Sequence, residues 1–364
     1  MEAAFEYVFP AIKGIQAKRE YFVSMCPLRL IPKIFLFDEE ELVPELRAQR
    51  TLNRQRIPEL ANYITEHRED YVFSAITASV DADMKFTPFQ EGEGDSRLGI
   101  LHIPMSATFI INDGQHRRAA IEIALRERPD LADETIAVVF FLDVGLKRCQ
   151  QMFADLNRYA VKPSKSLGIL YDHGDEWAEI SRQLVHDSDA FRDVVEMEKT
   201  TLAARSRRLF TLSAIHGATK LLLVNFHDHP IEERIALATH FWDGVDQNIK
   251  EWGLVRNGKI SSGEVRQDFI HSHGVMLSAL GRAGASLINE FPKDWQKKIS
   301  PLKKVNWSRA NVELWEGRAM RRGRLTKASD NVILCGNVIK RELGLSLTPE
   351  EQRVEDTFIR GDYD

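Results

Sequence analysis

"FIINDGQHRRAAI", residues 109–121, is an apolar run that stops at "NDG" and continues at once with the residue spacing of a helix. We predict a strand over residues 108–111 and a helix from residue 115 to about residue 127, which makes "NDG" a strand-to-helix turn. Polar residues at a buried corner are costly unless they are paired or used for binding. The corner is therefore a candidate functional site.

The corner has the chemistry of an anion site. Gly114 permits a tight turn or the close approach of a ligand, and Asp113 can cap the helix by accepting hydrogen bonds from its first amides. Those amides and the guanidinium of Arg117 suit a phosphate. In the structural alternative, Asp113 is only a cap, and His116 and Arg117 tie strands together by hydrogen bonds. The phosphate-site candidates at the corner are Asp113, Gly114, Gln115, His116 and Arg117.

The segments around the corner predict an α+β first half. Residues 56–67 carry one apolar helical stripe, residues 71–80 are rich in β-branched and aromatic residues, and residues 136–142 form another apolar run. With the corner, they give the order helix, strand, strand, helix, strand. A further helix begins after Asp143. We predict one mixed α/β core over residues 1–170.

The second half has a different pattern. From residue 166 onward, apolar residues recur at spacings of three and four, with almost no alternation of period two. We predict a mainly helical second domain over residues 171–364.

Composition and length set further bounds. The chain has 364 residues, more than one core usually organises, and a net charge of −5. No apolar stretch approaches the roughly 20 residues of a membrane span, and the N-terminus opens with an acid where a signal peptide needs basic residues. We therefore expect a cytoplasmic protein without a membrane partner.

Cysteine and histidine spacing argues against a metal site. Cys26, Cys149 and Cys335 lie far apart without a CxxC pair, and the histidines lack HExxH spacing. We expect no bound metal. Cys26 is either a reactive thiol or a small buried hydrophobe, and the second role is favoured. No Ser-His-Asp or Walker pattern is present in the sequence.

Other cationic residues are candidates for the same pocket. Arg50, Arg54 and Arg56 precede the first predicted helix, where an arginine cluster suits oxyanions. A solvated charged loop is the alternative. Lys165, in "VKPSKS", either adds a phosphate contact or flanks a helix cap at Ser164.

Basic residues also gather in the second half. Residues 301–341 contain ten Lys/Arg against three Asp/Glu, whereas residues 342–364 contain seven acids against two arginines. Such segregation can present a basic face to nucleic acid, although charge runs are usually solvated surface. The candidates for contacts with the DNA backbone are Lys303, Lys304, Arg309, Arg318, Arg321, Arg322, Arg324 and Lys327, together with Arg205, Arg207 and Arg208.

Two motifs resemble a known superfamily. "GQHRRAA", residues 114–120, fits GxxRxxA and resembles the nucleotide-binding motif of the ParB/sulfiredoxin superfamily. "FADLNRYAVKPSKSL", residues 153–167, is similar to that superfamily's second phosphate-side segment, with Asn157 and Arg158 at its polar positions. Leu156 stands where a glutamate is common, which favours binding over hydrolysis. The resemblance implies a ParB/sulfiredoxin-like core. A nucleoside triphosphate, ATP or CTP, is the candidate ligand, and no cofactor is expected to be required.

A longer resemblance covers nearly the whole chain. "RTLNRQRIPELANYI", "INDGQHRRAAI", "MFADLNRYAVKPSKSLGILYD" and "NWSRANVELWEG" occur in order. Together they resemble the DGQHR-domain family, and within it the DndB proteins of bacterial DNA phosphorothioation systems. The resemblance implies a transcriptional repressor that binds the double-stranded promoter DNA of the modification operon.

Two other functions stay open at the sequence level. One is a nucleotide-dependent enzyme, an NTPase or a nicking nuclease, with Asp113 and His116 as the acid and base candidates. The other is a scaffold that binds partner proteins. The sequence leaves the oligomeric state open.

Overall fold

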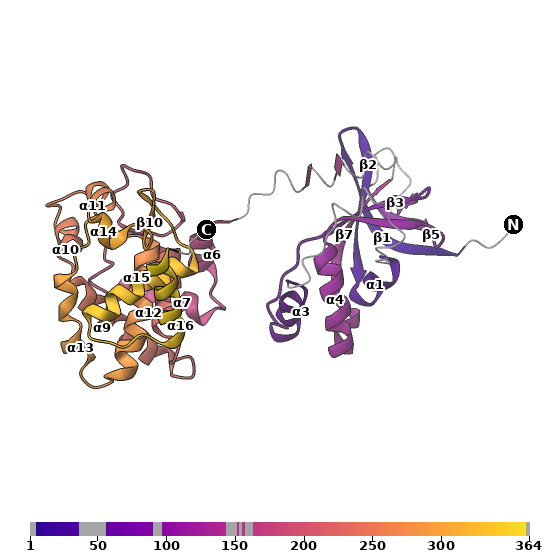
Figure 1. The fold of residues 1–364 in the computed structure, drawn as a ribbon. Coiled ribbons are helices and arrows are strands. Elements are labelled where there is room, and N and C mark those ends of the chain that lie inside the picture. Colours follow the sequence, from indigo (N-terminus) through magenta and orange to yellow (C-terminus); the bar gives the residue numbers. More distant parts are fainter. Residues whose placement is uncertain are drawn as a thin grey trace. The chain divides into compact units, whose positions relative to one another are not determined.

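The computed structural model describes residues 5–35, 56–89, 97–142, 151–152, 155–156 and 163–361 (Figure 1). The chain divides into two compact units, Met1–Val161 and Lys162–Asp364. The first unit contains a mixed sheet and the second is mostly helical. The predicted α+β class, a mixed core followed by a helical second half, is confirmed.

Seven strands form the sheet of the first unit, in the order β4-β5-β1-β2-β7-β3-β6. Among the described residues of this sheet, β3 and β7 pair in parallel and the other neighbouring strands are antiparallel. The strands are β1 (Glu6–Gln16), β2 (Arg19–Pro27), β3 (Ile76–Asp81), β4 (Lys85–Pro88), β5 (Leu98–Pro104), β6 (Thr108–Asp113) and β7 (Thr135–Leu142).

Helices pack against one face of this sheet. They are α1 (Ile31–Ile34), α3 (Arg56–Glu66) and α4 (Gln115–Glu127), with the 3-10 turns η1 (Leu28–Leu30) and η2 (Pro129–Asp133). Alternate strand residues such as Phe9, Ala78 and Phe140 share one core with Ile64 of α3 and Ile121 of α4. On β1 the intervening residues are exposed, so the apolar core lies on one side of the strand.

The structure differs from the sequence prediction in three places. Residues 71–75 are not a strand, and β3 begins only at Ile76. Strands β1, β2, β4 and β5 were not predicted. The helix predicted after Asp143 falls almost entirely outside the described residues.

The second unit is built around one buried helix. α12 (Gly274–Glu290) has most of its residues buried, and it packs against α8 and α15. The other elements are α6 (Lys165–Tyr171), α7 (Glu176–Asp187), β8 (Val195–Glu196), β9 (Phe210–Thr211), α8 (Leu212–Leu222), α9 (Ile231–Asp246), α10 (Lys250–Arg256), α11 (Ser262–Asp268), α13 (Trp295–Lys298), η3 (Ser300–Lys304), α14 (Val312–Trp315), β10 (Met320–Arg321), β11 (Arg324–Leu325), α15 (Ser329–Glu342) and α16 (Pro349–Arg360).

A buried polar cluster joins α16 to its neighbours. Arg318 donates to both carboxylate oxygens of Glu355, at 2.9 and 2.7 Å, and Asn337 of α15 donates to Glu355 at 2.9 Å. Arg341 donates a further hydrogen bond to Glu355 at 2.8 Å. Because Glu355 is fully buried, its carboxylate depends on these donors.

Candidate functional site

The corner between β6 and α4 has the predicted strand-turn-helix form. Gly114 is the N-cap of α4 and has φ 109°, a left-handed conformation that L side chains rarely adopt. A Cβ atom at this position would lie 3.0 Å from Ile76 Cγ1 and 3.2 Å from Arg117 Nε. Glycine therefore meets both the conformational and the steric demand of the turn.

We expect Gly114→Ala to lower the free energy of unfolding by about 1–2 kcal/mol, since a side chain in the left-handed region costs this much. Urea denaturation of both proteins measures the change. Gly168→Ala is the matched control, because Gly168 lies within α6 with no neighbouring atom within 4 Å of its added Cβ. The control should be neutral or stabilising by up to about 1 kcal/mol. Equal losses in both variants would contradict the steric explanation.

Asp113 has a different role from the predicted one. The N-cap residue of α4 is Gly114, which provides no side-chain cap, and the carboxylate of Asp113 accepts from Nη2 of Arg117 at 2.7 Å, one helical turn further on. The prediction that Asp113 caps the helix is therefore wrong, because Gly114 takes the cap position and places Asp113 one residue before it. The first amides of α4 thus lack an intrahelical acceptor, and the N-cap Gly114 has no side chain to accept from them.

Arg117 binds two residues at the corner and has one N–H donor without an acceptor in the part of the chain that the structure describes. Its Nη1 donates to the hydroxyl of Ser74, in the extended segment before β3, and its Nη2 donates to Asp113. Its Nε is buried and has no hydrogen-bond partner among the described residues. Buried donors are normally paired, so the guanidinium has spare capacity for an acceptor.

His116 lies half-buried in a cationic environment. Burial lowers the pKa of His116, and the charges of Arg56 and Arg117 lower it further, while Asp113 opposes the shift. Arg56 belongs to α3, which packs against α4. His116 is therefore neutral at neutral pH, and the positive charge of the corner comes from the two arginines.

The neighbouring polar residues of the motif are structural. Arg118 is buried and donates to the backbone carbonyls of Phe35 and Pro32, which fastens α1 to α4. Gln115 is also buried and donates to the carbonyl of Ile111 at 3.1 Å. Asn112 donates to Ser79 Oγ of β3 at 2.7 Å. Of these, Gln115 was a phosphate-site candidate, and its amide is committed to the strand end.

The remaining candidates for the phosphate pocket lie elsewhere. Arg50, Arg54, Asn157 and Arg158 lie outside the described residues. Lys165 is the first residue of α6 and so belongs to the second unit. Sequence reasoning missed Ser74, because residues 71–80 were interpreted as one strand rather than as an extended segment that passes the corner.

Three predicted DNA contacts project from a short hairpin, here called the basic hairpin (residues 320–325). β10 and β11 pair across Arg322 and Gly323, which have φ 51° and 70°, as two-residue hairpins require. Arg321, Arg322 and Arg324 are exposed. A two-residue turn therefore brings three exposed arginines together on one short hairpin.

Other predicted DNA contacts divide into exposed and committed residues. Lys303 and Lys304, at the end of η3, are exposed. Arg318 is buried in its ion pair with Glu355 and lies over the ring of Phe358. The prediction that Arg318 contacts DNA is not supported by this placement, because its charge is already neutralised. Lys327 lies near Lys165, whose charge adds to burial in lowering the pKa of Lys327.

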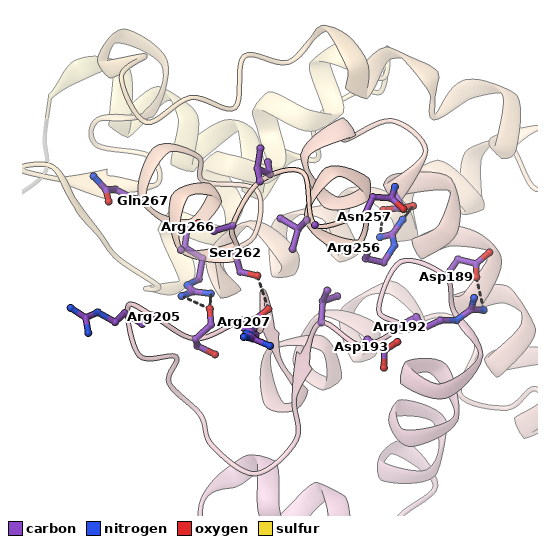
Figure 2. Close-up of a pocket in the computed structure, with 18 of the residues that line it drawn as sticks. Asp189, Arg192, Asp193, Arg205, Arg207, Arg256, Asn257, Ser262, Arg266 and Gln267 are labelled. Atoms are coloured by element: carbon purple, nitrogen blue, oxygen red, sulfur yellow. Dashed lines mark hydrogen bonds and ion pairs between the residues drawn. The ribbon is translucent and has the colours of Figure 1, made fainter.

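Arg205, Arg207 and Arg208 lie on the segment between β8 and β9, here called the arginine loop (residues 203–208). This loop borders a cleft of about 1400 Å³ within the second unit. Figure 2 shows Arg205 and Arg207 on one side of the cleft with Ser262 and Arg266, and Asp189, Arg192 and Asp193 on the other side.

The two cysteines that the structure describes, Cys26 and Cys335, are buried. Cys26 is fully buried, and burial raises its pKa to about 12, so it behaves as the small hydrophobe favoured by the sequence. Cys335 is likewise buried. Within the described part of the chain, no group of three or more His, Cys, Asp or Glu side chains is placed to hold a metal ion. No helix in the same part is long and apolar enough to cross a membrane.

Comparison with known families gives one match. The model of the family described as "DndB: DNA-sulfur modification-associated" matches residues 9–346. Comparison with curated proteins and with solved structures gave no match.

Proposed function

Because the chain belongs to the DndB family of DNA-sulfur modification-associated proteins, we propose that it is a cytoplasmic, DNA-binding repressor of a phosphorothioate modification operon. The observation that carries this proposal is the basic hairpin, which presents Arg321, Arg322 and Arg324 on a defined turn. Guanidinium groups on a rigid element pair with successive phosphates of a DNA strand. Such contacts give affinity for any sequence, so promoter preference has to come from contacts with base edges.

The experiment is a salt titration of binding to the chain's own promoter fragment and to scrambled duplex of equal length. A repressor binds the promoter fragment more tightly at every salt concentration. Equal affinity for the two duplexes contradicts operator-specific repression. No binding to either duplex contradicts a DNA-binding function altogether.

We also propose that the corner holds a phosphate group, such as that of ATP or CTP. Three features support this: the uncapped amides of α4, the unpartnered Nε of Arg117, and the charge of Arg56 beside His116. Each of them favours an anion. A bound phosphate would also provide the acceptor that Arg117 Nε lacks.

Arg117→Ala should weaken nucleotide binding by at least about tenfold, because it removes a charged donor and leaves Asp113 facing the anion without its partner. Isothermal calorimetry with ATP and CTP measures the effect. Arg126→Ala, an exposed arginine later in the same helix, is the matched control and should bind as the wild type does. Absence of nucleotide or phosphate binding by the wild type at millimolar concentration would refute the pocket.

An enzyme is the second candidate, and the neutral state of His116 favours it, since a general base must be unprotonated. Against it, the carboxylate of Asp113 is engaged by Arg117. Release of inorganic phosphate in the calorimetry samples, or cleavage of DNA, separates the two functions. If the wild type turns over nucleotide or DNA and both Asp113→Asn and His116→Ala abolish this activity, the proposed function changes from repressor to enzyme.

A further inference from the structure

Two basic segments that lie more than 100 residues apart in sequence are fastened to the same short helix, α11. The first is the arginine loop. The guanidinium of Arg266, in α11, donates to the carbonyls of Ala203 and Ala204, both at 3.0 Å, and to that of Ser206 at 3.3 Å. It also donates to the carbonyl of Arg208. The side chain of Arg266 thus binds four carbonyls of the loop and holds the loop backbone in one conformation.

Two further residues of α11, Ser262 and Gly263, also contact the arginine loop closely. Ser262 Oγ donates to the carbonyl of Arg207 at 2.6 Å. A Cβ atom on Gly263 would lie only 2.9 Å from the carbonyl oxygen of Ala204, so the approach of the loop requires glycine there. With its carbonyls turned toward α11, the loop has a defined backbone before any ligand arrives.

The second segment is the basic hairpin, which is fastened to the C-terminal end of the same helix. Arg309 donates from Nη1 to the carbonyl of Gln267 at 3.2 Å and from Nη2 to the carbonyl of Gly323 at 3.0 Å. Its backbone amide also donates to the carbonyl of Asp268 at 2.8 Å. Arg309 therefore bridges the last carbonyls of α11, which lack helical partners, and the turn of the hairpin.

The charges of two residues in the arginine loop are left available. The side chains of Arg205 and Arg207 are exposed and form no hydrogen bond or ion pair with the described residues, and Figure 2 shows Arg205 pointing away from the other labelled side chains. Three of the four carboxylates that line the cleft are already engaged. Asp189 pairs with Arg192, Asp246 pairs with Arg256, and Asp243 accepts from Ser188. These three acids therefore leave the charge of the arginine loop uncancelled, and the backbone carbonyl of the fourth acid, Asp193, accepts from Arg208.

We propose that α11 is the scaffold of one continuous phosphate-binding surface, in which the arginine loop and the basic hairpin contact the backbone of the same DNA duplex. Arg266 and Arg309 are positioning residues, since their guanidinium groups hold backbone carbonyls and orient the contacting arginines. A duplex suits the surface better than a single small anion, because the cations come from two separate elements that are fastened to different residues of one helix. This inference rests on the proposed DNA-binding function and adds the surface that performs it.

The test is a salt titration of DNA binding by the full chain with a duplex of the promoter fragment. Arg205→Ala/Arg207→Ala should lower the log-log salt slope by about 1.8, and Arg322→Ala/Arg324→Ala by a similar amount. Because both segments contact one duplex, the fourfold variant should lose about 3.6. Between 50 and 200 mM salt, each pair of contacts corresponds to roughly a tenfold difference in the fall of affinity. Arg192→Ala, in the same cleft but paired with Asp189, should keep the wild-type slope.

Arg266→Lys tests the positioning role, because it keeps the charge but cannot hold four carbonyls at once. Arg266→Lys should reduce the salt slope as much as Arg205→Ala/Arg207→Ala does. When the two changes are combined, Arg266→Lys should reduce the slope no further. A lower melting temperature with an unchanged slope would refute the positioning role. A wild-type slope in Arg205→Ala/Arg207→Ala would refute the surface while leaving DNA binding intact, whereas failure of the wild type to bind DNA would refute both proposals.

Discussion

Replacing Glu355 by Ala should lower the free energy of unfolding by about 3–5 kcal/mol, the cost of leaving buried charge without its partner. Arg318, which is itself buried, would lose both of its hydrogen bonds to the carboxylate, and Asn337 would lose one. Urea denaturation at neutral pH measures the loss. Glu342→Ala, an exposed glutamate at the end of α15, is the control and should change stability by less than about 0.5 kcal/mol. Similar losses in the two variants would contradict a structural role for the buried cluster.

The same cluster makes stability depend on pH. Burial alone would raise the pKa of Glu355, but hydrogen bonds from Arg318 and Asn337 outweigh burial and lower the pKa below its ordinary 4.5. A carboxyl whose pKa is lower in the folded state contributes stability above the unfolded pKa and loses it as the pH falls through the folded pKa. Wild-type stability should therefore fall more steeply below pH 4.5 than that of Glu355→Ala. Parallel pH curves for the two proteins would contradict this linkage.

Reversing the charge of Arg321 and Arg322 to Glu should weaken binding to every DNA sequence, on the order of 10- to 100-fold at 0.1 M salt. Each lost phosphate contact lowers the log-log slope by about 0.9, so the double variant should lose about 1.8. Promoter preference should persist, because contacts with phosphates position the protein without reading bases. A salt titration with promoter and scrambled duplexes measures affinity, slope and preference together.

The matched control is Arg353→Glu/Arg360→Glu, which makes the same change in net charge on α16. If general electrostatic attraction to DNA were responsible, both double variants would bind equally weakly. We expect the wild-type slope in the control. An unchanged slope in Arg321→Glu/Arg322→Glu would exclude the basic hairpin from the DNA contact.

Elements of the fold could be predicted from the sequence where the local hydrophobic pattern is strong. The corner, α3 and β7 were predicted within a few residues because each has a clear apolar period and a turn signal. β1 was missed because its pattern contradicts the usual rules. Pro10 lies inside β1, where the strand pairs with β5 and the register with β2 has not yet begun, and Val8 and Ile12 are apolar on the exposed face of the strand. A strand without polar-apolar alternation has no period to detect.

The site was predictable only where the contacts are local. The pair of Asp113 and Arg117 has the i, i+4 spacing of facing helix residues. Arg318, by contrast, belongs to an arginine-rich segment that the sequence predicts to be exposed. Its partner Glu355 lies 37 residues further along the chain. The shared attachment of the arginine loop and the basic hairpin to α11 is likewise a tertiary contact. No local sequence pattern predicts this shared attachment.

The order of strands in the sheet has a consequence for how the chain reaches its native state. β2 pairs with β7, and β7 in turn pairs with β3, so β7 joins the group β4-β5-β1-β2 to the pair β3-β6. During synthesis the hairpin of β1 and β2 leaves the ribosome long before residues 135–142, and until then one edge of β2 has no partner. Such distant pairings slow folding, because a long loop must close before its contacts form. A chain that ends before Thr135 would form two separate sheets with unpaired inner edges, which are sites for aggregation.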